Sequence, residues 1–196
     1  MNAPEVVYLI RHGRTDLNAA GRLRGRLDPP LDLKGRTEAT ALASLFHNLQ
    51  LVAVVCSPLL RARQTAEPIA AATRAPLRFD DRLLDRDYGS WAGHALGEVE
   101  RRFGSVDAAP GVEPLAAFGA RVSTAILGLV DDYAPGPVAV VAHDAVNRHA
   151  LAHLVPDLGD ADRIVQRTGC WNRLEHNGSG WTATIIDGVP DDGRRP

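Results

Sequence analysis

The residues best suited to chemistry in this sequence are an arginine and a histidine, Arg11 and His12, near its beginning. They follow Val6–Ile10, a short apolar run rich in β-branched residues, which is typical of a buried strand. Gly13 comes next and permits a tight turn, so we expect Arg11 and His12 at the carboxyl edge of a sheet, where open α/β sheets bind ligands. There an arginine can fix an anion while the imidazole attacks it or moves a proton.

Two later apolar runs end in similar residues. Leu51–Cys56 predicts a second strand, and Ser57-Pro58 then signals a helix start, with the serine as cap and the proline in the first turn. Arg61 would lie in the first turn of that helix. Val138–Ala142 predicts a third strand, which ends at His143-Asp144. Because the carboxyl ends of parallel strands lie together, we expect all of these side chains to converge.

Two imidazoles and two guanidinium groups in one cleft repel one another when charged, and a phosphate dianion relieves that repulsion. We therefore infer phosphoryl transfer to nitrogen, in which His12 attacks phosphorus and water resolves the phosphohistidine. Neighbouring arginines should lower the pKa of His12 below its ordinary value of about 6.5 and keep it neutral. Arg11, Arg61 and His143 would hold the phosphoryl oxygens, and Asn18 would add a neutral donor.

The remaining pattern predicts a three-layer α/β/α sandwich around a mostly parallel sheet, because strands and helices alternate for most of the length. We expect one domain over residues 1–190 and a polar tail over 191–196. The segment 82–109 is charged and irregular, and we expect it to cover part of the sheet edge. The other expected elements are a loop over 15–30, a helix capped by Asp32, helices over Leu96–Phe103 and Glu113–Tyr133, and a hairpin of Trp171–Glu175 and Trp181–Ile186.

Composition narrows the function classes. The 196 residues carry a formal net charge of −2, which argues against general nucleic-acid binding. Cys56 and Cys170 show no metal-like or paired spacing, and we find no signal peptide and no apolar run that could span a membrane. We therefore expect a cytoplasmic protein. Arginines cluster beside His12, which suits an anion-facing rim; they are Arg11, Arg14, Arg22, Arg24 and Arg26.

Several segments in order resemble the histidine phosphatase superfamily, which includes the cofactor-dependent phosphoglycerate mutases. They are Arg11-His12-Gly13, the run 57–66 around Arg61, the run 83–93 around Asp85, and Val140–His143. The resemblance implies a phosphoglycerate mutase-like fold and a site without metal or cofactor. It implies catalytic roles for Arg11, His12, Arg61, Asp85, His143 and Asp144, and substrate binding by Arg11, Asn18, Arg24, Gly25, Arg61 and His143.

Three positions depart from the family pattern. Arg24 stands where the family usually has glutamine, so substrate contacts there can differ. Asp85 stands where many relatives carry a glutamate as proton donor. Asp144 follows His143 where mutases often have glycine, and a His-Asp pair resembles the acid-phosphatase branch, whose aspartate is the donor. The context Tyr-Gly-x-Trp-x-Gly favours Asp85 over Asp144 as general acid, and both stay candidates.

The leading hypothesis is a metal-independent phosphatase that hydrolyses a small phosphorylated metabolite. A phosphoglycerate-type mutase is the alternative within the family, and a catalytically silent phospho-ligand or protein-binding module is the alternative outside it. A zinc site at His12 and His143 is disfavoured because the adjacent arginines would repel a cation. The C-terminal hairpin or the edge strand could form a homodimer.

Overall fold

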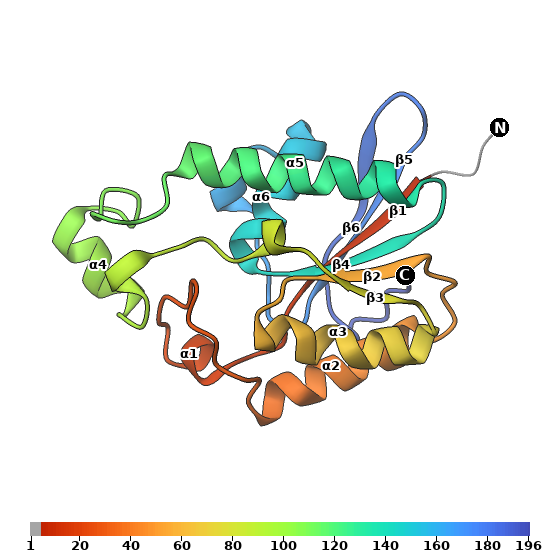
Figure 1. Cartoon of the computed structure of the whole chain (residues 1–196), viewed down its shortest axis with the longest axis horizontal. Helices are drawn as coiled ribbons and strands as arrows, with labels where there is room; N and C mark the ends of the chain where they lie inside the picture. Colours follow the sequence, from red (N-terminus) through yellow and green to blue (C-terminus); the bar gives the residue numbers. More distant parts are fainter. Residues whose placement is uncertain (1–4) are drawn as a thin grey trace.

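The computed structural model describes residues 5–196 and centres on one six-stranded sheet (Figure 1). The strand order is β3-β2-β4-β1-β5-β6. The strands are β1 (Glu5–Arg11), β2 (Ala53–Cys56), β3 (Leu77–Phe79), β4 (Val138–Ala142), β5 (Trp171–His176) and β6 (Trp181–Gly188).

The first four strands of the chain, β1 to β4, run parallel to one another, as the alternating pattern predicts. β1 pairs with β4, and β2 pairs with both β4 and β3, in parallel register. Arg11 lies opposite Ala142, and Cys56 lies opposite Val141, so the three strands end at the same edge of the sheet. β5 and β6 form the predicted hairpin, and β5 pairs with β1 in antiparallel register.

Helices cover both faces of this sheet, which confirms the three-layer architecture. They are α1 (Asp16–Ala19), α2 (Leu33–Phe46), α3 (Leu60–Thr73), α4 (Leu96–Phe103), α5 (Leu115–Tyr133) and α6 (Asp144–Leu154). Short 3-10 helices occur at Asp81–Leu83, Gly89–Trp91, Pro156–Leu158 and Ala161–Arg163. Within residues 5–196, every helix is too short or too polar to cross a membrane.

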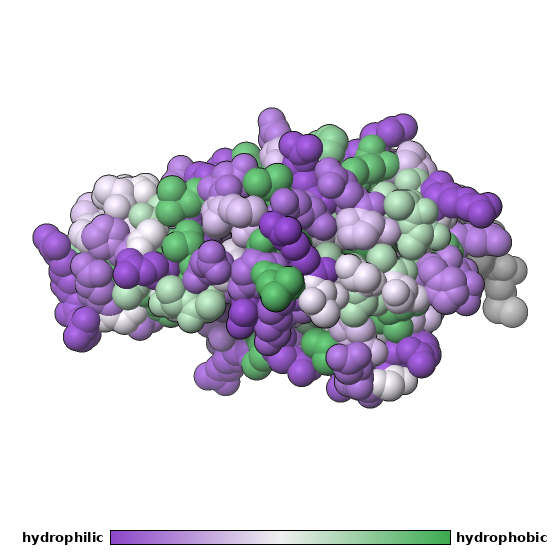
Figure 2. Space-filling model, turned by 90° about the horizontal axis from the view of Figure 1, so that it is seen from below, coloured by the Kyte–Doolittle hydropathy of each residue, from purple (hydrophilic) through white to green (hydrophobic). Residues whose placement is uncertain are grey.

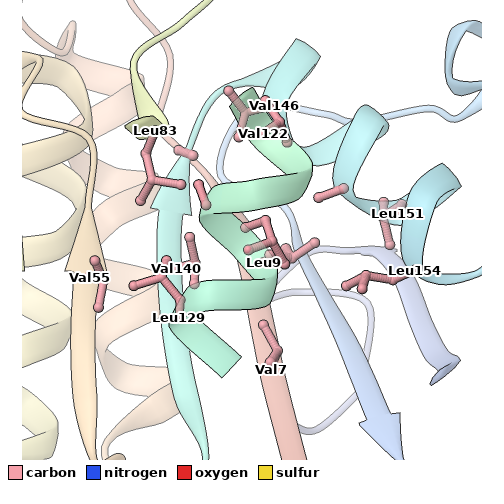
Figure 3. Packing of buried hydrophobic residues seen from close by; sticks show 14 of the residues in the cluster. Val7, Leu9, Val55, Leu83, Val122, Leu129, Val140, Val146, Leu151 and Leu154 are labelled. Carbon is pink, nitrogen blue, oxygen red and sulfur yellow. The ribbon is translucent and has the colours of Figure 1, made fainter. Parts of the chain in front are cut away.

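The alternation of side chains along each strand divides the core into two layers. Val7 and Leu9 of β1 and Val140 of β4 face α5 and α6, where Val122 and Leu151 pack against them (Figure 3). The intervening strand residues face α2 and α3 on the other side; this second cluster includes Tyr8, Ile10, Val54, Val141, Leu42, Phe46 and Ile69.

The outer surface beneath α2 is mainly hydrophilic. Seen from below in Figure 2, hydrophobic side chains are scattered among hydrophilic ones over this side. α2 shows why: Leu42 and Phe46 are fully buried against the sheet, whereas Leu33 at its start is 83% exposed. Asp32 caps this helix as predicted, since its carboxylate accepts a hydrogen bond from the amide of Gly35 at 2.8 Å.

α1 and α4 lie together at the end of the molecule opposite the N-terminus (Figure 1). A small separate cluster joins them, in which Leu23 and Val99 are buried and Trp91 and Phe103 pack around them. An antiparallel bridge between Arg22 and Ala95 ties the two segments. The segment 82–109 therefore packs on the loop of residues 20–30 (the 20s loop), beyond the carboxyl edge of the strands. This agrees with the expected partial cover.

Two local predictions are wrong. Residues 15–30 are not all loop, because α1 forms at Asp16, and Thr15 and Asn18 cap it reciprocally. Ser57 does not cap α3: that helix begins at Leu60 with Leu59 as an N-cap residue that forms no side-chain cap hydrogen bond. The Ser57 hydroxyl instead contacts the imidazole of His143 at 2.8 Å.

The ends of the chain add little to the core. Residues 1–4 lie outside the described part of the expected domain. In the expected polar tail, the carboxylate of Asp192 accepts a hydrogen bond from the amide of Val189, and Arg194 donates to the carbonyl of Ile186. These contacts hold the tail against the end of β6.

Candidate active site

The predicted catalytic side chains converge at the carboxyl edge of the sheet. His12 follows β1, His143 follows β4, and their ring centroids are 5.2 Å apart. Arg61, in the first turn of α3, donates from Nε to Nε2 of His12 at 3.3 Å. Arg61 also forms an ion pair with Asp85 at 3.0 Å. Four residues far apart in sequence therefore form one cluster.

The contacts of His12 fix its tautomer. Its Nδ1 lies 2.7 Å from the carbonyl oxygen of Gly13. A carbonyl oxygen can only accept a hydrogen bond, so Nδ1 must carry the proton and Nε2 must hold a free electron pair. Nε2 faces the Arg61 guanidinium. His12 thus presents an unprotonated nitrogen to the space where an anion would be bound.

Both histidines are held neutral. Burial lowers the pKa of His12 well below its ordinary value, and the charge of Arg61 lowers it further. Burial and Arg61 have the same effect on the pKa of His143. The direction predicted for His12 is confirmed, but burial outweighs the arginines as its cause, because the imidazole of His12 is 0% exposed.

Arg61 holds the cluster together through all three of its nitrogens. Besides His12 and Asp85, it donates to the carbonyl of Leu27 at 2.7 Å and to the carbonyl of Gly25 at 3.0 Å. The side chain is fully buried. A lysine offers three donors from one atom and cannot reproduce this planar arrangement.

His143 and Asp85 complete the inner part of the site. His143 Nε2 lies 2.8 Å from the Ser57 hydroxyl, and its Nδ1 is buried without a hydrogen-bond partner, 3.9 Å from an Asp85 oxygen. The other Asp85 oxygen accepts from the amide of Arg86 at 3.0 Å. The free Nδ1 is thereby directed toward the same interior space as Asp85.

Arg11 and Asp144 lie farther out. Arg11 donates to Asp144 at 3.4 Å and to the carbonyl of Gln166. Asp144 also pairs with Arg148 at 3.2 Å, and its side chain is 28% exposed, against 3% for Asp85. Burial lowers the pKa of Arg11, although Asp144 opposes this. The structure thus places Asp85 among the buried groups and Asp144 at the rim.

The expected substrate-binding residues of the N-terminal loop differ in position. Asn18 uses its side-chain oxygen to cap α1, where it accepts from the amide of Thr15 at 3.1 Å. The Gly25 carbonyl accepts from Arg61, so this glycine positions the Arg61 guanidinium. A Cβ at Gly25 would come within 2.9 Å of the Tyr88 ring, and the backbone φ of +49° also favours glycine at this position. Arg24 lines the same cleft as Arg11, and its charge lowers the pKa of both His12 and His143.

Sequence reasoning missed three contributors. Ser57 was assigned a capping role, which its position before Pro58 also suits. Gln166 and Leu27 act through their backbone carbonyls, which accept from Arg11 and Arg61 respectively. No side-chain pattern can reveal a carbonyl acceptor of this kind, because any residue supplies one.

This arrangement is suited to an anion. Two guanidinium groups and two neutral imidazoles surround the space beside the His12 Nε2 atom. Within residues 5–196, no group of three or more His, Cys, Asp or Glu side chains is placed to hold a metal ion. The His12 side chain is fully buried, so local separation of the surrounding side chains must precede contact with a phosphoryl group. A cleft of about 570 Å³ reaches the site beside Arg11 and Asp144.

Comparison with known proteins identifies the family of this chain. The model of the histidine phosphatase superfamily, branch 1, matches residues 7–187. The chain is 29% identical to the Bacillus subtilis protein PhoE, named as an uncharacterized phosphatase, over 89% of this chain and 90% of that protein. It is 40% identical to the Salmonella choleraesuis protein named "Probable phosphoglycerate mutase GpmB", over 42% of this chain and only 39% of that one.

A solved structure extends the likeness to three dimensions. The mycobacterial glucosyl-3-phosphoglycerate phosphatase in complex with VO3 superposes with a TM-score of 0.83. It is 25% identical, and the match covers 94% of this chain and all of that one. Since the family match spans nearly the whole sequence and includes every residue of the cluster, this chain belongs to the histidine phosphatase superfamily, branch 1.

Proposed function

We propose that this protein is a phosphatase that hydrolyses a small phosphomonoester through a phosphohistidine on His12, without a metal ion. The observation that carries the proposal is the protonated Nδ1 of His12, which donates to the Gly13 carbonyl and leaves Nε2 unprotonated, accepting from the Arg61 guanidinium. A phosphatase with a nitrogen nucleophile needs this unprotonated atom next to a cation that binds the phosphoryl oxygens.

The reaction proceeds in two displacements. Nε2 of His12 bonds to phosphorus while the bond from phosphorus to the ester oxygen breaks, and the departing oxygen takes a proton from a carboxylic acid. Water then attacks the phosphohistidine, returns a proton to that carboxylate, and the nitrogen–phosphorus bond breaks to release phosphate. Arg11, Arg61 and His143 bind the phosphoryl oxygens as charge moves through the transition state.

Asp85 is the better placed of the two candidate acids. It is 3% exposed and lies within 3.9 Å of His143, in the interior where the leaving oxygen would be found. Asp144 is bound at the rim between Arg11 and Arg148. Replacing each aspartate with asparagine separates them: loss of the acid slows esters of poor leaving groups far more than aryl esters. Equal losses on both kinds of ester in Asp85→Asn would contradict its role.

The named relatives support a small phosphorylated metabolite as substrate, since they include a phosphatase of glucosyl-3-phosphoglycerate. A phosphoglycerate mutase is the second candidate, supported by the 40% identity to a protein named as a probable mutase. Hydrolysis requires water at the phosphohistidine. The cleft brings solvent as far as Arg11 and Asp144, and His12 becomes accessible when the side chains around it separate. The homodimer and the cytoplasmic location expected from the sequence stay predictions.

The direct test is phosphate release from 4-nitrophenyl phosphate and from a panel of phosphorylated metabolites. We expect turnover that resists chelators and disappears in His12→Ala, with a phosphohistidine trapped on the wild-type protein by rapid acid-free quenching. His153→Ala is the matched control, because His153 is exposed on α6. Isomerisation of 3-phosphoglycerate without net phosphate release would favour the mutase, and ligand binding without turnover would favour the silent module.

A further inference from the structure

The cleft beside Arg11 extends away from the catalytic cluster toward α4. Its inner end is lined by Arg11 and Asp144, and its outer part by the 20s loop, the segment 105–107 and α6. At about 570 Å³ it has room for far more than a phosphoryl group. The part of the substrate that remains after the phosphate is removed would therefore occupy it.

Charges along this cleft are mostly neutralised within the protein. Asp107 pairs with Arg86, Asp144 pairs with Arg11 and Arg148, and Asp162 pairs with Arg148. The remaining acid of the lining, Glu100, is exposed on α4.

Arg24 differs from the paired arginines. Among residues 5–196 it forms no ion pair, and its one hydrogen bond runs to the carbonyl of Arg22 at 3.1 Å. Its Nε atom is buried without a partner. Arg24 is half-buried, and its Nε atom has lost water without gaining an acceptor, which is unfavourable in the free protein; a bound anion would offset that cost.

A neutral donor accompanies Arg24. Tyr88 also lines the cleft, and its ring lies against the backbone at Gly25. Burial raises the pKa of the Tyr88 hydroxyl, so it keeps its proton and can donate. Arg24 and Tyr88 line the same cleft as Arg11, the neighbour of His12 in the sequence, and the charge of Arg24 lowers the pKa of His12.

Arg26 provides a contrast within the same loop. It is exposed, and it is absent from the lining of the cleft. The arginine-rich loop is thus not a uniform anion-binding rim. In the part of the chain that the structure describes, Arg22 and Arg24 line the cleft without an ion pair, and Arg22 donates to the carbonyl of Gly93 at 2.7 Å, whereas Arg26 remains in solvent.

We propose that the substrate carries a second anionic group besides the phosphoryl group to be transferred, and that Arg24 binds it in the outer cleft. The inference rests on the proposed phosphatase activity. A carboxylate and a second phosphate have the same chemistry toward a guanidinium, which forms paired, charge-assisted hydrogen bonds with either. The inferred class is therefore a phosphomonoester that also bears a carboxylate or a second phosphate.

Matched pairs of esters test this class. 3-Phosphoglycerate and glycerol 3-phosphate differ in the carboxylate, and fructose 1,6-bisphosphate and fructose 6-phosphate differ in the second phosphate. Phosphate release gives kcat/KM for each ester with wild type, Arg24→Gln and Arg26→Gln. The readout is the ratio within each pair, because Arg24 also acts on His12 and its loss changes the rate for every ester.

We expect wild type to prefer the doubly anionic member of at least one pair, and Arg24→Gln to reduce that preference about tenfold to a hundredfold, the range for one charge-assisted contact. Arg26→Gln removes the same charge and should keep the preference. The pair that responds identifies carboxylate or phosphate as the second group.

Other outcomes overturn the inference in distinguishable ways. Wild-type hydrolysis without preference in either pair, or an equal preference in Arg24→Gln, would refute the role of Arg24 while leaving the phosphatase intact. The wild-type comparison needs no variant, so the absence of a preference refutes the inference even where Arg24→Gln does not fold. An absence of phosphate release from every ester would refute the proposed function and this inference together.

Discussion

Acidification should destabilise this protein through its two active-site histidines. Both imidazoles are buried, and the pKa of each lies well below its ordinary value in the folded state. An unfolded chain binds protons at these residues as the pH falls through about 6.5, whereas the folded protein does not. A depressed histidine pKa therefore leaves stability intact above that pH and reduces it below.

The size of the effect follows from the unfolded chain. At pH 5, protonation of a free imidazole stabilises the unfolded state by about 2 kcal/mol, and a folded imidazole that stays neutral recovers none of it. His12 and His143 together would lower the free energy of unfolding by about 4 kcal/mol between pH 7 and pH 5. This is a large part of the stability of an ordinary domain, and it corresponds to a fall of roughly 8–16 °C in Tm.

Urea unfolding at pH 7 and pH 5, in buffers free of phosphate, measures this difference. His143→Gln should retain about half of the pH-dependent loss, since one of the two imidazoles is gone. His153→Gln changes an exposed histidine on α6 and should behave as wild type. A difference below about 1 kcal/mol in wild type would refute the reasoning, because the imidazoles would then be charged in the folded protein and His12 would not be a neutral nucleophile.

Three substitutions extend these expectations. Ser57→Ala removes the hydroxyl that lies 2.8 Å from His143 and should lower kcat about tenfold with less effect on KM, as seen in steady-state kinetics, while Ser57→Thr retains the hydroxyl and restores activity. Asn172→Ala removes a fully buried amide that bonds three neighbours and should cost about 3 kcal/mol or more in urea unfolding; an effect below 1 kcal/mol would contradict this. Gly35→Ala would place a Cβ 2.1 Å from the carbonyl oxygen of Arg14 and should destabilise the protein by more than about 2 kcal/mol, measured in the same way.

Much of the fold was predictable because it depends on apolar pattern. Val138–Ala142 is apolar throughout and forms β4 with those same bounds, and the expected helix Leu96–Phe103 is α4. The sharp transition from each apolar run to a polar residue also located the site, since parallel strands bring His12 and His143 to one edge whatever separates them in sequence. The bounds of these elements and the position of the site can therefore be predicted from short stretches of sequence.

Contacts made by a single hydroxyl group could not be predicted from the sequence in the same way. Ser57 before Pro58 fits a helix cap as well as it fits a hydrogen bond to His143, and the choice depends on where β4 lies beside β2. α1 was missed because four residues show no helical period, although Thr15 and Asn18 satisfy each other as caps do. For Ser57, tertiary structure selects the partner of the hydroxyl.

Arg61 shows why burial decides the chemistry of this site. The sequence predicts its position near the sheet edge, yet an arginine in a first helical turn is usually solvated. Here two carbonyls of the 25–27 segment and one carboxylate accept its hydrogen bonds, so the side chain is fully buried with its charge retained. The loss of water around the imidazole, together with that buried charge, lowers the pKa of His12 and keeps it unprotonated. The same loop therefore positions Arg61 beside the proposed nucleophile and, through Arg24, lines the cleft in which we propose that the rest of the substrate binds.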